Sequence, residues 1–293
     1  MPEPEMKLPN GFLLRAAFDR TAANYDRHAV LEREVADRLM ERLEFVRDEP
    51  VRVVDLGSGT GYCCEALKRR FPEAEVIGLD ASFAMSRALG RRANAAYPIE
   101  AVCADLSLLP FASCSVDLLL SNLAFQWSGD FRRLFEGFRH ILRPGGMLLF
   151  STLGPDSLTE FKSAAGLEES RNSLRNFPDM HDVGDALLAA GFSEPVMDSE
   201  HITMEYQRMD SMMDELEATG VDTHFDDWGR HRENSRDLMC AYREFCRNGR
   251  YPVTWEIVYG TAFGPDEGQP FRTPEGEVAA FSVDYLRGSM TRR

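Results

Sequence analysis

The stretch "VVDLGSGTGYCCEAL" (residues 53–67) begins as an apolar run and turns abruptly into glycine. Gly57, Gly59 and Gly61 fall within five residues, shortly after the acidic residue Asp55. The apolar run predicts a buried strand, and the residues after the glycines predict a helix. Because glycine has no Cβ atom, such a turn adopts positive φ and lets its backbone approach a ligand closely. The sequence therefore predicts a ligand-binding turn at the end of a buried strand.

Short apolar runs alternate with helical stretches on both sides of this turn. We expect strands at 51–57, 75–80, 99–105, 116–121, 147–153, 194–206 and 253–263. Helices are expected between them at 62–71, 82–94, 130–142 and 181–192. This alternation predicts an α/β protein with a mostly parallel sheet, helices on both of its faces and an antiparallel last strand.

The chain divides into a core and additions to it. Residues 1–50 are expected to form an N-terminal cap of two helices before the core at 51–263. Residues 154–180 and 208–250 read as helical insertions at one edge of that core, the second with helices at 208–220 and 233–248. The tail at 264–293, rich in glycine, proline and acidic residues, is expected to be loosely ordered.

Composition excludes several classes of protein. The formal net charge of −15 argues against a nucleic-acid surface. No stretch approaches the roughly 20 apolar residues of a membrane helix, and no secretory signal opens the chain. We therefore expect a soluble, cytoplasmic protein with neither nucleic acid nor a membrane as partner. The six cysteines lack metal-ligand spacing, so they read as reduced core thiols, with no metal site.

The spacing of the glycines selects among three classes of ligand. A mononucleotide-binding Walker loop requires Lys and then Ser or Thr after the last glycine, and Tyr62 and Cys63 stand there instead. The dinucleotide pattern G-x-G-x-x-G fails because the third glycine arrives one position early. The remaining pattern, D-x-G-x-G-x-G, suits S-adenosylmethionine. Asp55 places negative charge near a ligand that carries an ammonium and a sulfonium group.

Two more acidic residues are predicted to end neighbouring strands. Asp80 is placed to bind a ribose diol, and Asp105 is placed to accept from an adenine amine, with Leu106 and Met85 packed on the ring. Each acid alone has another explanation, because a strand-end residue often caps the next helix. Methyl transfer from a sulfonium is a direct displacement, so no Ser, Cys or His triad is expected.

Longer stretches carry a resemblance to known enzymes. The glycine turn and the strand-end acids resemble those of the class I S-adenosylmethionine-dependent methyltransferases, which implies their Rossmann-like sheet. The segments "FSTLGPDSL", "FPDMHD" and "GRYPVTW" are more discriminating. Together with residues 18–39, 109–127 and 142–161, they resemble the malonyl-acyl carrier protein O-methyltransferases of biotin synthesis. The similarity runs in order from about residue 12 to residue 263.

The resemblance implies a reaction and its partners. The free carboxylate of a malonyl thioester, carried on acyl carrier protein or coenzyme A, would be methylated by S-adenosyl-L-methionine. A carboxylate is already ionised at neutral pH, so it needs positioning rather than a base. Two departures stand out: Ser58 replaces the cysteine more often found in the turn, and Arg175 and Asn176 invert the usual order before Phe177.

The candidate site residues fall into two groups. The cofactor-binding candidates are Tyr25, Asp55, Gly57, Ser58, Gly59, Gly61, Asp80, Ala81, Met85, Asp105, Leu106, Asn122 and Leu123. The catalytic candidates, which would shape the acceptor pocket or orient its carboxylate, are Tyr25, Gln126, Trp127, His181 and His224. Tyr25 alternatively packs between helices, Trp127 alternatively belongs to the core, and each histidine alternatively has a structural role.

A basic surface is needed for an acidic carrier protein, because the whole chain is itself acidic. The candidates are Arg132, Arg133, Arg139 and Arg143, or else the arginines between residues 230 and 250. Two other functions share the same cofactor motifs. One is an O- or C-methyltransferase of a quinone or other small metabolite. The other is an assembly or regulatory protein that binds the cofactor without turnover.

Overall fold

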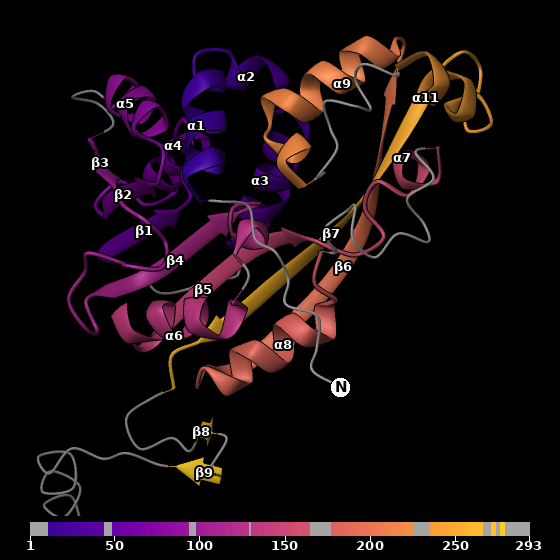
Figure 1. Ribbon diagram of the computed structural model, residues 1–293. Coiled ribbons are helices and arrows are strands. Elements are labelled where there is room, and N and C mark those ends of the chain that lie inside the picture. Colours follow the sequence, from indigo (N-terminus) through magenta and orange to yellow (C-terminus); the bar gives the residue numbers. More distant parts are fainter. Residues whose placement is uncertain are drawn as a thin grey trace, which may run out of the picture.

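The structure is a computed structural model. It describes residues 11–43, 49–93, 98–128, 130–164, 177–224, 235–265, 271–273 and 276–278. One sheet organises these residues (Figure 1). Its strands are β1 (Arg52–Leu56), β2 (Glu75–Asp80), β3 (Ile99–Cys103), β4 (Val116–Asn122), β5 (Leu142–Leu153), β6 (Ser193–Tyr206) and β7 (Tyr251–Phe263).

The strands lie in the order β3-β2-β1-β4-β5-β7-β6. β1 to β5 pair in parallel, and β7 runs antiparallel to both β5 and β6. The predicted α/β sheet, mostly parallel with an antiparallel last strand, is confirmed. The strand order reverses at β1 and β4, whose connections leave in opposite directions, and ligands bind at such a reversal in open parallel sheets.

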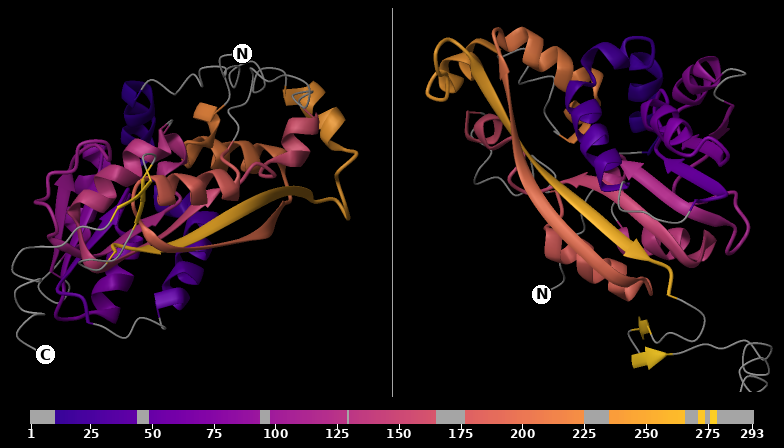
Figure 2. Two further views of the ribbon diagram at one scale, coloured as in Figure 1. Left: turned by 90° about the horizontal axis from the view of Figure 1, so that it is seen from below. Right: turned by 180° about the vertical axis from the view of Figure 1, so that it is seen from behind.

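Helices cover both faces of the sheet (Figures 1 and 2). One face carries α3 (Val30–Arg42), α4 (Tyr62–Arg70) and α5 (Phe83–Arg92), and the other carries α6 (Phe131–Ile141) and α8 (Met180–Ala189). Side chains alternate across each strand, so Val53 packs in the core on the α3 side while Val54 packs against α6. Burial on both faces explains the almost continuous apolar runs of the central strands.

The described part of the N-terminal segment, residues 11–43, forms three α-helices where two were predicted. α1 (Gly11–Thr21) is followed by the single turn α2 (Tyr25–His28) and then by α3. A turn at residues 22–24 and a break at Ala29 separate them. A four-residue helix is too short to produce a recognisable apolar period, so periodicity merges it with its neighbours.

Several helices gather around the far ends of the long strands β6 and β7 (Figure 1). They are α7 (Thr159–Ala164), α9 (Met209–Ala218), η3 (Val221–His224) and α11 (Ser235–Tyr242). α11 ends at Tyr242, before the predicted end at residue 248, and turns follow at residues 243–245 and 248–249. The short strands β8 (Phe271–Thr273) and β9 (Gly276–Val278) form a hairpin within the predicted tail.

The cysteine prediction needs correction. Cys63 and Cys64 are buried, but Cys103, Cys114 and Cys240 are exposed, so most of the cysteines are not core thiols. Cys103 ends β3, which is the edge strand of the sheet and is covered less completely than the central strands. Among the described residues, no helix has the length and apolar character to cross a membrane.

Candidate functional site

The glycine turn lies between the end of β1 and the start of α4. All three glycines have positive φ, of 77°, 53° and 96° at Gly57, Gly59 and Gly61. A Cβ atom added to Gly57 would overlap the side chain of Ala124, in the loop after β4. One added to Gly59 would lie 3.9 Å from the ring of Tyr25. The sequence therefore needs glycine both for the backbone angles and for the close packing.

Asp80, at the end of β2, is tied to this turn. Its carboxylate accepts hydrogen bonds from the backbone N–H groups of Gly59 (2.9 Å) and Ser82 (2.8 Å). Burial raises the pKa of Asp80 to about 6, against the lowering effect of these two bonds. Each oxygen accepts one of these bonds, and a carboxylate oxygen can accept two, so the group still has capacity for a ligand hydroxyl.

Asp55 lies beneath the turn and is 1% exposed. The thiol of Cys64, on the first turn of α4, donates to its Oδ2 at 3.1 Å. Burial raises the pKa of Asp55 to about 7, although the Cys64 thiol acts in the opposite direction. A buried carboxylate with so few donors is costly to ionise, and a cationic ligand would offset that cost.

Asp105 lies just beyond β3, on the same edge of the sheet. It accepts from the Ser107 amide (2.9 Å) and hydroxyl (2.7 Å). Partial burial pushes its pKa up, but the hydrogen bonds from Ser107 outweigh this effect and leave the pKa below its usual value. Arg15 of α1 approaches the carboxylate at 3.9 Å. This acid is therefore ionised at neutral pH.

The N-terminal helices are fixed over the turn by two aspartates. Asp19 of α1 accepts from the Ser82 hydroxyl (2.6 Å) and the Ala84 amide (3.0 Å) at the start of α5. Asp26 of α2 accepts from the Thr60 hydroxyl at 2.5 Å and pairs with Arg92. These contacts hold the helices against the turn.

A cavity of about 220 Å³ lies between the turn, the strand ends and α1. Ten of the thirteen cofactor-binding candidates line it: Tyr25, Gly57, Gly59, Asp80, Ala81, Met85, Asp105, Leu106, Asn122 and Leu123. A smaller cavity of about 40 Å³ adjoins it and is lined in part by Asp55. Ser58 and Gly61 do not line either cavity. They belong to the turn that shapes it, where the Ser58 hydroxyl is buried without a partner among the described residues.

Tyr25 is a wall of both cavities. Its ring packs edge-on against Phe18 of α1, with 6.5 Å between ring centroids, and the edge of the ring lies beside Gly59. Burial raises the pKa of Tyr25 well above its usual value, with Glu32 and Asp80 adding to the effect. Its phenol is therefore a neutral donor at physiological pH.

Asn122 and Leu123 close the cavity at the end of β4. Asn122 Nδ2 donates to the Glu32 carbonyl and its Oδ1 accepts from the Ser151 hydroxyl, both at 2.8 Å. Leu123 has a positive φ of 45°, which is uncommon for a residue with a large side chain. These contacts bring α3 onto the strand end and fix the loop that carries Ala124.

The catalytic candidates are not all brought together. Gln126 Nε2 donates to the Leu123 carbonyl at 2.7 Å, while its Oε1 is buried without a partner among the described residues. Trp127 ends the 3₁₀ turn η2 (Phe125–Trp127), and its side chain lies outside the described part. Phe125 of the same turn is fully buried among Phe131, Phe135 and Phe150.

The two histidines take different positions. His181 is 84% exposed at the start of α8, where its Nδ1 lies 2.7 Å from Asp179, the residue that caps the helix. The structure does not bring it to either cavity. His224 ends η3, near α9, and its side chain is not among those described. Arg175 lies outside the described residues, as do the arginines at 230 and 232.

Three of the docking arginines belong to α6, Arg132 and Arg133 at its start and Arg139 near its end, and Arg143 follows on β5. Arg132 pairs with Glu136 at 3.1 Å, one turn away on the exposed face, and Arg133 follows it. At the other end, Arg139 donates to the Leu142 carbonyl at 3.2 Å and Arg143 pairs with Asp117 at 2.5 Å. The first pair is therefore at the cavity end of α6, and the second pair holds the β4–β5 connection.

Sequence reasoning missed the residues that α1 contributes. Leu14, Arg15 and Phe18 of α1 line the larger cavity, together with the glycine turn and the strand ends. The signal in the sequence was the amphipathic stretch that includes them, but its apolar face could equally have packed on the core. Ser107 and Ser128 also line the cavity, and nothing in their spacing indicated it.

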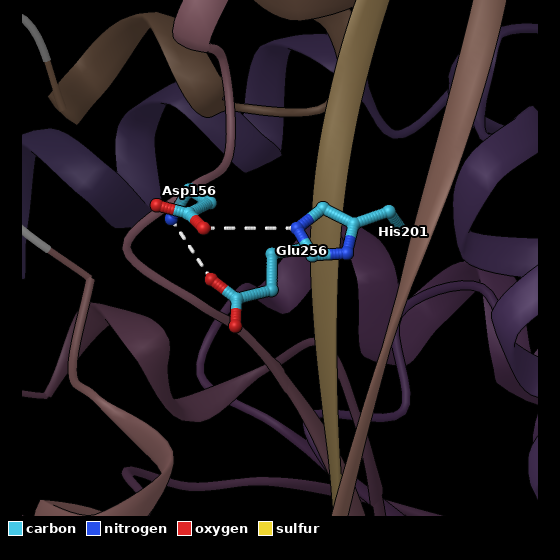
Figure 3. Close-up of side chains that lie close together, drawn as sticks. All are labelled: Asp156, His201 and Glu256. Carbon is cyan, nitrogen blue, oxygen red and sulfur yellow. Dashed lines mark hydrogen bonds and ion pairs between the residues drawn. The ribbon is translucent and has the colours of Figure 1, made fainter.

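A separate cluster lies on β6, β7 and the loop after β5 (Figure 3). Asp156, His201 and Glu256 present oxygen or nitrogen atoms within 4.8 Å of one another. Glu256 already accepts from the Asp156 backbone N–H at 2.8 Å, and the nearby Lys162 ammonium offsets the two carboxylates. Asp156 and His201 are more than half exposed, so water competes for both groups.

Comparisons with known proteins agree with this geometry. Residues 54–150 match the family model described as "Methyltransferase domain". The chain is 43% identical to the malonyl-[acyl-carrier protein] O-methyltransferase of Laribacter hongkongensis, over 86% of this chain and 89% of that one. It is 42% identical to the protein of the same name from Halorhodospira halophila, over 90% and 92% of the two chains.

Solved structures show the same fold at lower identity. A putative methyltransferase from Bacillus halodurans aligns with a TM-score of 0.56 and 16% identity, over 78% of this chain and 98% of that one. The putative methyltransferase of Haloferax volcanii, solved with the Trm112 methyltransferase activator, gives 0.57 and 21%, over 86% and 97%. At these identities the similarity concerns the fold alone.

Proposed function

The chain belongs to the malonyl-acyl carrier protein O-methyltransferases, and from this membership we propose that it converts the free carboxylate of a malonyl thioester into a methyl ester. S-adenosyl-L-methionine is the cofactor, and it supplies an electrophilic methyl group on a sulfonium that departs as a neutral thioether. The supporting observation is a cavity at the sheet reversal, between the positive-φ glycine turn and three acidic strand ends.

The residues of this cavity fit the cofactor chemically. We propose that Asp80 accepts from the two ribose hydroxyls, because its carboxylate lies beside Gly59 with acceptor capacity to spare. Asp105 would accept from the adenine amine, with Met85 and Leu106 against the ring. The acidic walls suit a ligand that carries positive charge, since buried carboxylates without a cation are costly to ionise.

The acceptor needs alignment and dehydration, and no proton transfer is required. A malonyl carboxylate is ionised at neutral pH. One of its oxygens attacks the methyl carbon as the carbon–sulfur bond breaks, so the products are the ester and the thioether. We propose that Tyr25 and Phe18 exclude water from this reaction and that Gln126, whose Nε2 donates to the Leu123 carbonyl, supports the loop on the acceptor side.

The carrier protein would dock near the cavity end of α6. We propose that Arg132 and Arg133 provide the positive charge there, because both are exposed beside the cavity-lining residue Leu134, whereas Arg139 and Arg143 lie at the other end of α6 and bond to Leu142 and Asp117. The compartment that we propose is the cytosol, since the six cysteines form no disulfide and the cytosol keeps thiols reduced.

Incubation of the purified protein with S-adenosylmethionine and malonyl-acyl carrier protein tests the function. We expect mass spectrometry of the carrier to show the gain of one methylene unit, removable by mild alkaline hydrolysis as expected of a methyl ester. Acetyl-acyl carrier protein, which has no free carboxylate, is the matched control. Methylation of a quinone or of another small acceptor in place of the malonyl thioester would contradict the proposal.

A further inference from the structure

Three segments meet at the polar cluster of Figure 3, and none of its residues lines either cavity at the glycine turn. Asp156 belongs to the loop after β5, His201 to β6 and Glu256 to β7. His201 and Glu256 are direct partners in the β6–β7 register, so their side chains leave the sheet on the same face. The Asp156 carboxylate turns toward the other two side chains (Figure 3).

The loop after β5 is built around the Glu256 side chain. Glu256 is only 9% exposed, and its Oε2 accepts from the Asp156 backbone N–H at 2.8 Å. A Cβ atom added to Gly154 would lie 2.4 Å from the Cδ and Oε2 atoms of Glu256, so glycine is needed to admit this carboxylate. The Ser157 hydroxyl donates to the Glu256 carbonyl and accepts from its N–H, both at 3.1 Å. The Glu256 carboxylate therefore has a fixed position.

The cluster lacks positive charge. The described residues bring one hydrogen-bond donor to the Glu256 carboxylate, the Asp156 amide, although a carboxylate has about four lone-pair sites. Lys162 is the nearby cation, and its ammonium donates to the Pro155 carbonyl at 2.7 Å. One ammonium balances only one of the two carboxylates, so a negative charge is left beside a buried group. Buried carboxylates in proteins are usually paired or coordinate a metal ion.

One imidazole nitrogen and two carboxylate oxygens form a recognisable ligand set. Imidazole favours zinc and its neighbours in the first transition row, whereas magnesium and calcium prefer oxygen ligands alone. Zinc bonds of about 2.0–2.2 Å in a tetrahedron place neighbouring ligand atoms about 3.3 Å apart. Asp156 Oδ2 and His201 Nε2 lie 3.8 Å apart, and all three ligand atoms lie within 4.8 Å of one another. Small rotations of the two exposed side chains are enough to close this gap.

We propose that Asp156, His201 and Glu256 bind a divalent transition-metal ion of the zinc type, with water completing its coordination. Glu256 provides the fixed ligand, and the exposed Asp156 and His201 side chains close on the ion. Such an ion joins the edge strand β6 to β7 and to the loop after β5. Its role is structural, because the cluster lies outside the cavities that hold the proposed cofactor.

Isothermal titration calorimetry of the EDTA-treated protein with Zn²⁺ tests the site. We expect one binding event whose affinity falls at least ten-fold in His201→Gln and in Asp156→Asn, since each change removes a ligand. Both side chains are exposed, so neither change disturbs the core. The cysteines are the same in every variant, so zinc bound by thiols does not alter the comparison. Mg²⁺ should give no heat that depends on His201, because it prefers oxygen ligands.

His181→Gln is the matched control. His181 is also an exposed histidine beside a carboxylate, with its Nδ1 2.7 Å from Asp179. In the part of the chain that the structure describes, no third ligand joins this pair. The control should therefore bind Zn²⁺ as tightly as the wild type does.

Hydrogen exchange gives a second measurement that locates the ion. Zn²⁺ should slow exchange in residues 154–158 and 199–203 of the wild type, by up to about ten-fold at a free concentration ten times the Kd. The same segments of His201→Gln should not respond. Equal affinity for Zn²⁺ in His201→Gln and the wild type would overturn the proposal, as would an equal loss in His181→Gln or protection of other segments alone.

Discussion

Asp55 and Asp80 hold their protons more tightly than surface carboxylates do, because the sheet edge removes them from water. Burial raises the pKa of Asp55 to about 7 and that of Asp80 to about 6. Asp105, only partly buried and bonded to Ser107, has a lowered pKa. The three strand-end acids therefore differ in how readily they ionise: Asp55 least, then Asp80, and Asp105 most. Variants of Asp80 and Asp55 test these differences.

Asp80 should bind the cofactor chiefly as a carboxylate. We expect Asp80→Asn to weaken S-adenosylhomocysteine binding about ten- to a hundred-fold, because hydrogen bonds to a charged acceptor are lost. In the wild type, affinity should fall as the pH drops through about 6, where Asp80 becomes protonated. Fluorescence or calorimetric titration between pH 5 and 8 measures both effects. Glu73→Gln, on an exposed turn, serves as the control, and equal affinities for the two variants would contradict this role.

Asp55 should lower the stability of the empty protein at neutral pH. Its pKa is raised on folding, so the folded state binds the proton more tightly, and stability falls as the pH rises from about 4 to about 7. The full shift corresponds to roughly 4 kcal/mol, and relaxation around the site makes an observed effect of about 1–3 kcal/mol more realistic.

The variant Asp55→Asn removes this titration. We expect it to be more stable than the wild type by about 1–3 kcal/mol at pH 8, with the advantage disappearing toward pH 4. Urea unfolding without ligand at several pH values measures this difference. An advantage that did not change with pH would mean that ionisation of Asp55 is not its cause.

At the scale of elements, the sheet was predictable and the cap was only partly so. Strands such as β1 and β4 are buried on both faces, so their sequences are short apolar runs that end in a polar residue such as Asn122. Asp80 and Asp105 follow two such apolar runs, so the sequence also predicted them at strand ends. Neighbouring parallel strands end at the same edge of a sheet, so their positions could be predicted without knowing the tertiary contacts.

The loops and the cap depend on contacts that a sequence does not display. His181 follows a capping aspartate, so its local pattern fits a helix start and its distance from the cavity is set by packing of α8. Glu32 reads as an ordinary first-turn acid of α3. Only the tertiary contact between α3 and Asn122 makes Glu32 a wall of the smaller cavity.

The contact between the glycine turn and the loop after β4 gives a prediction at this scale. We expect Gly57→Ala to cost about 2–4 kcal/mol, because the new methyl overlaps Ala124 and the backbone has a φ of 77°. Adding Ala124→Gly should recover the part due to overlap and leave the backbone part. Chemical denaturation of both single variants and the double variant measures this coupling.

Gly137 offers the matched control for this cycle. It lies within α6, and a Cβ added there would meet nothing within 4 Å. Gly137→Ala should therefore raise stability by up to about 1 kcal/mol, since alanine favours the helix. If Gly57→Ala were as harmless as Gly137→Ala, the close approach of the two loops would be wrong.

At the scale of the whole molecule, net charge and local charge act in opposite directions. The chain carries −15, which should repel an acidic carrier protein at long range. The arginines at the start of α6 stand near the cavity mouth, where Ser128 and Leu134 form part of its wall. We therefore expect the carrier protein to be attracted to this one surface and repelled by the rest of the molecule.

Charge reversal of Arg132 and Arg133 to Glu separates docking from catalysis. We expect KM for malonyl-acyl carrier protein to rise about ten-fold at low salt, with kcat nearly unchanged, because rim charges act mainly on association. KM for malonyl-coenzyme A, which has no carrier surface, should change much less. Raising the salt to about 0.5 M should reduce the difference between variant and wild type, since it screens the lost attraction.

The double reversal of Arg69 and Arg70 to Glu is the matched control for this experiment, because it changes the net charge by the same amount as the reversal of Arg132 and Arg133. Arg69 lies on α4, across the sheet from α6, and pairs with Glu65 one turn away just as Arg132 pairs with Glu136. Both changes therefore break a helical surface ion pair, and only one lies at the proposed docking site. If both variants raised KM for the carrier substrate equally, net charge would account for the effect. If neither did, the carrier would approach the cavity from another side.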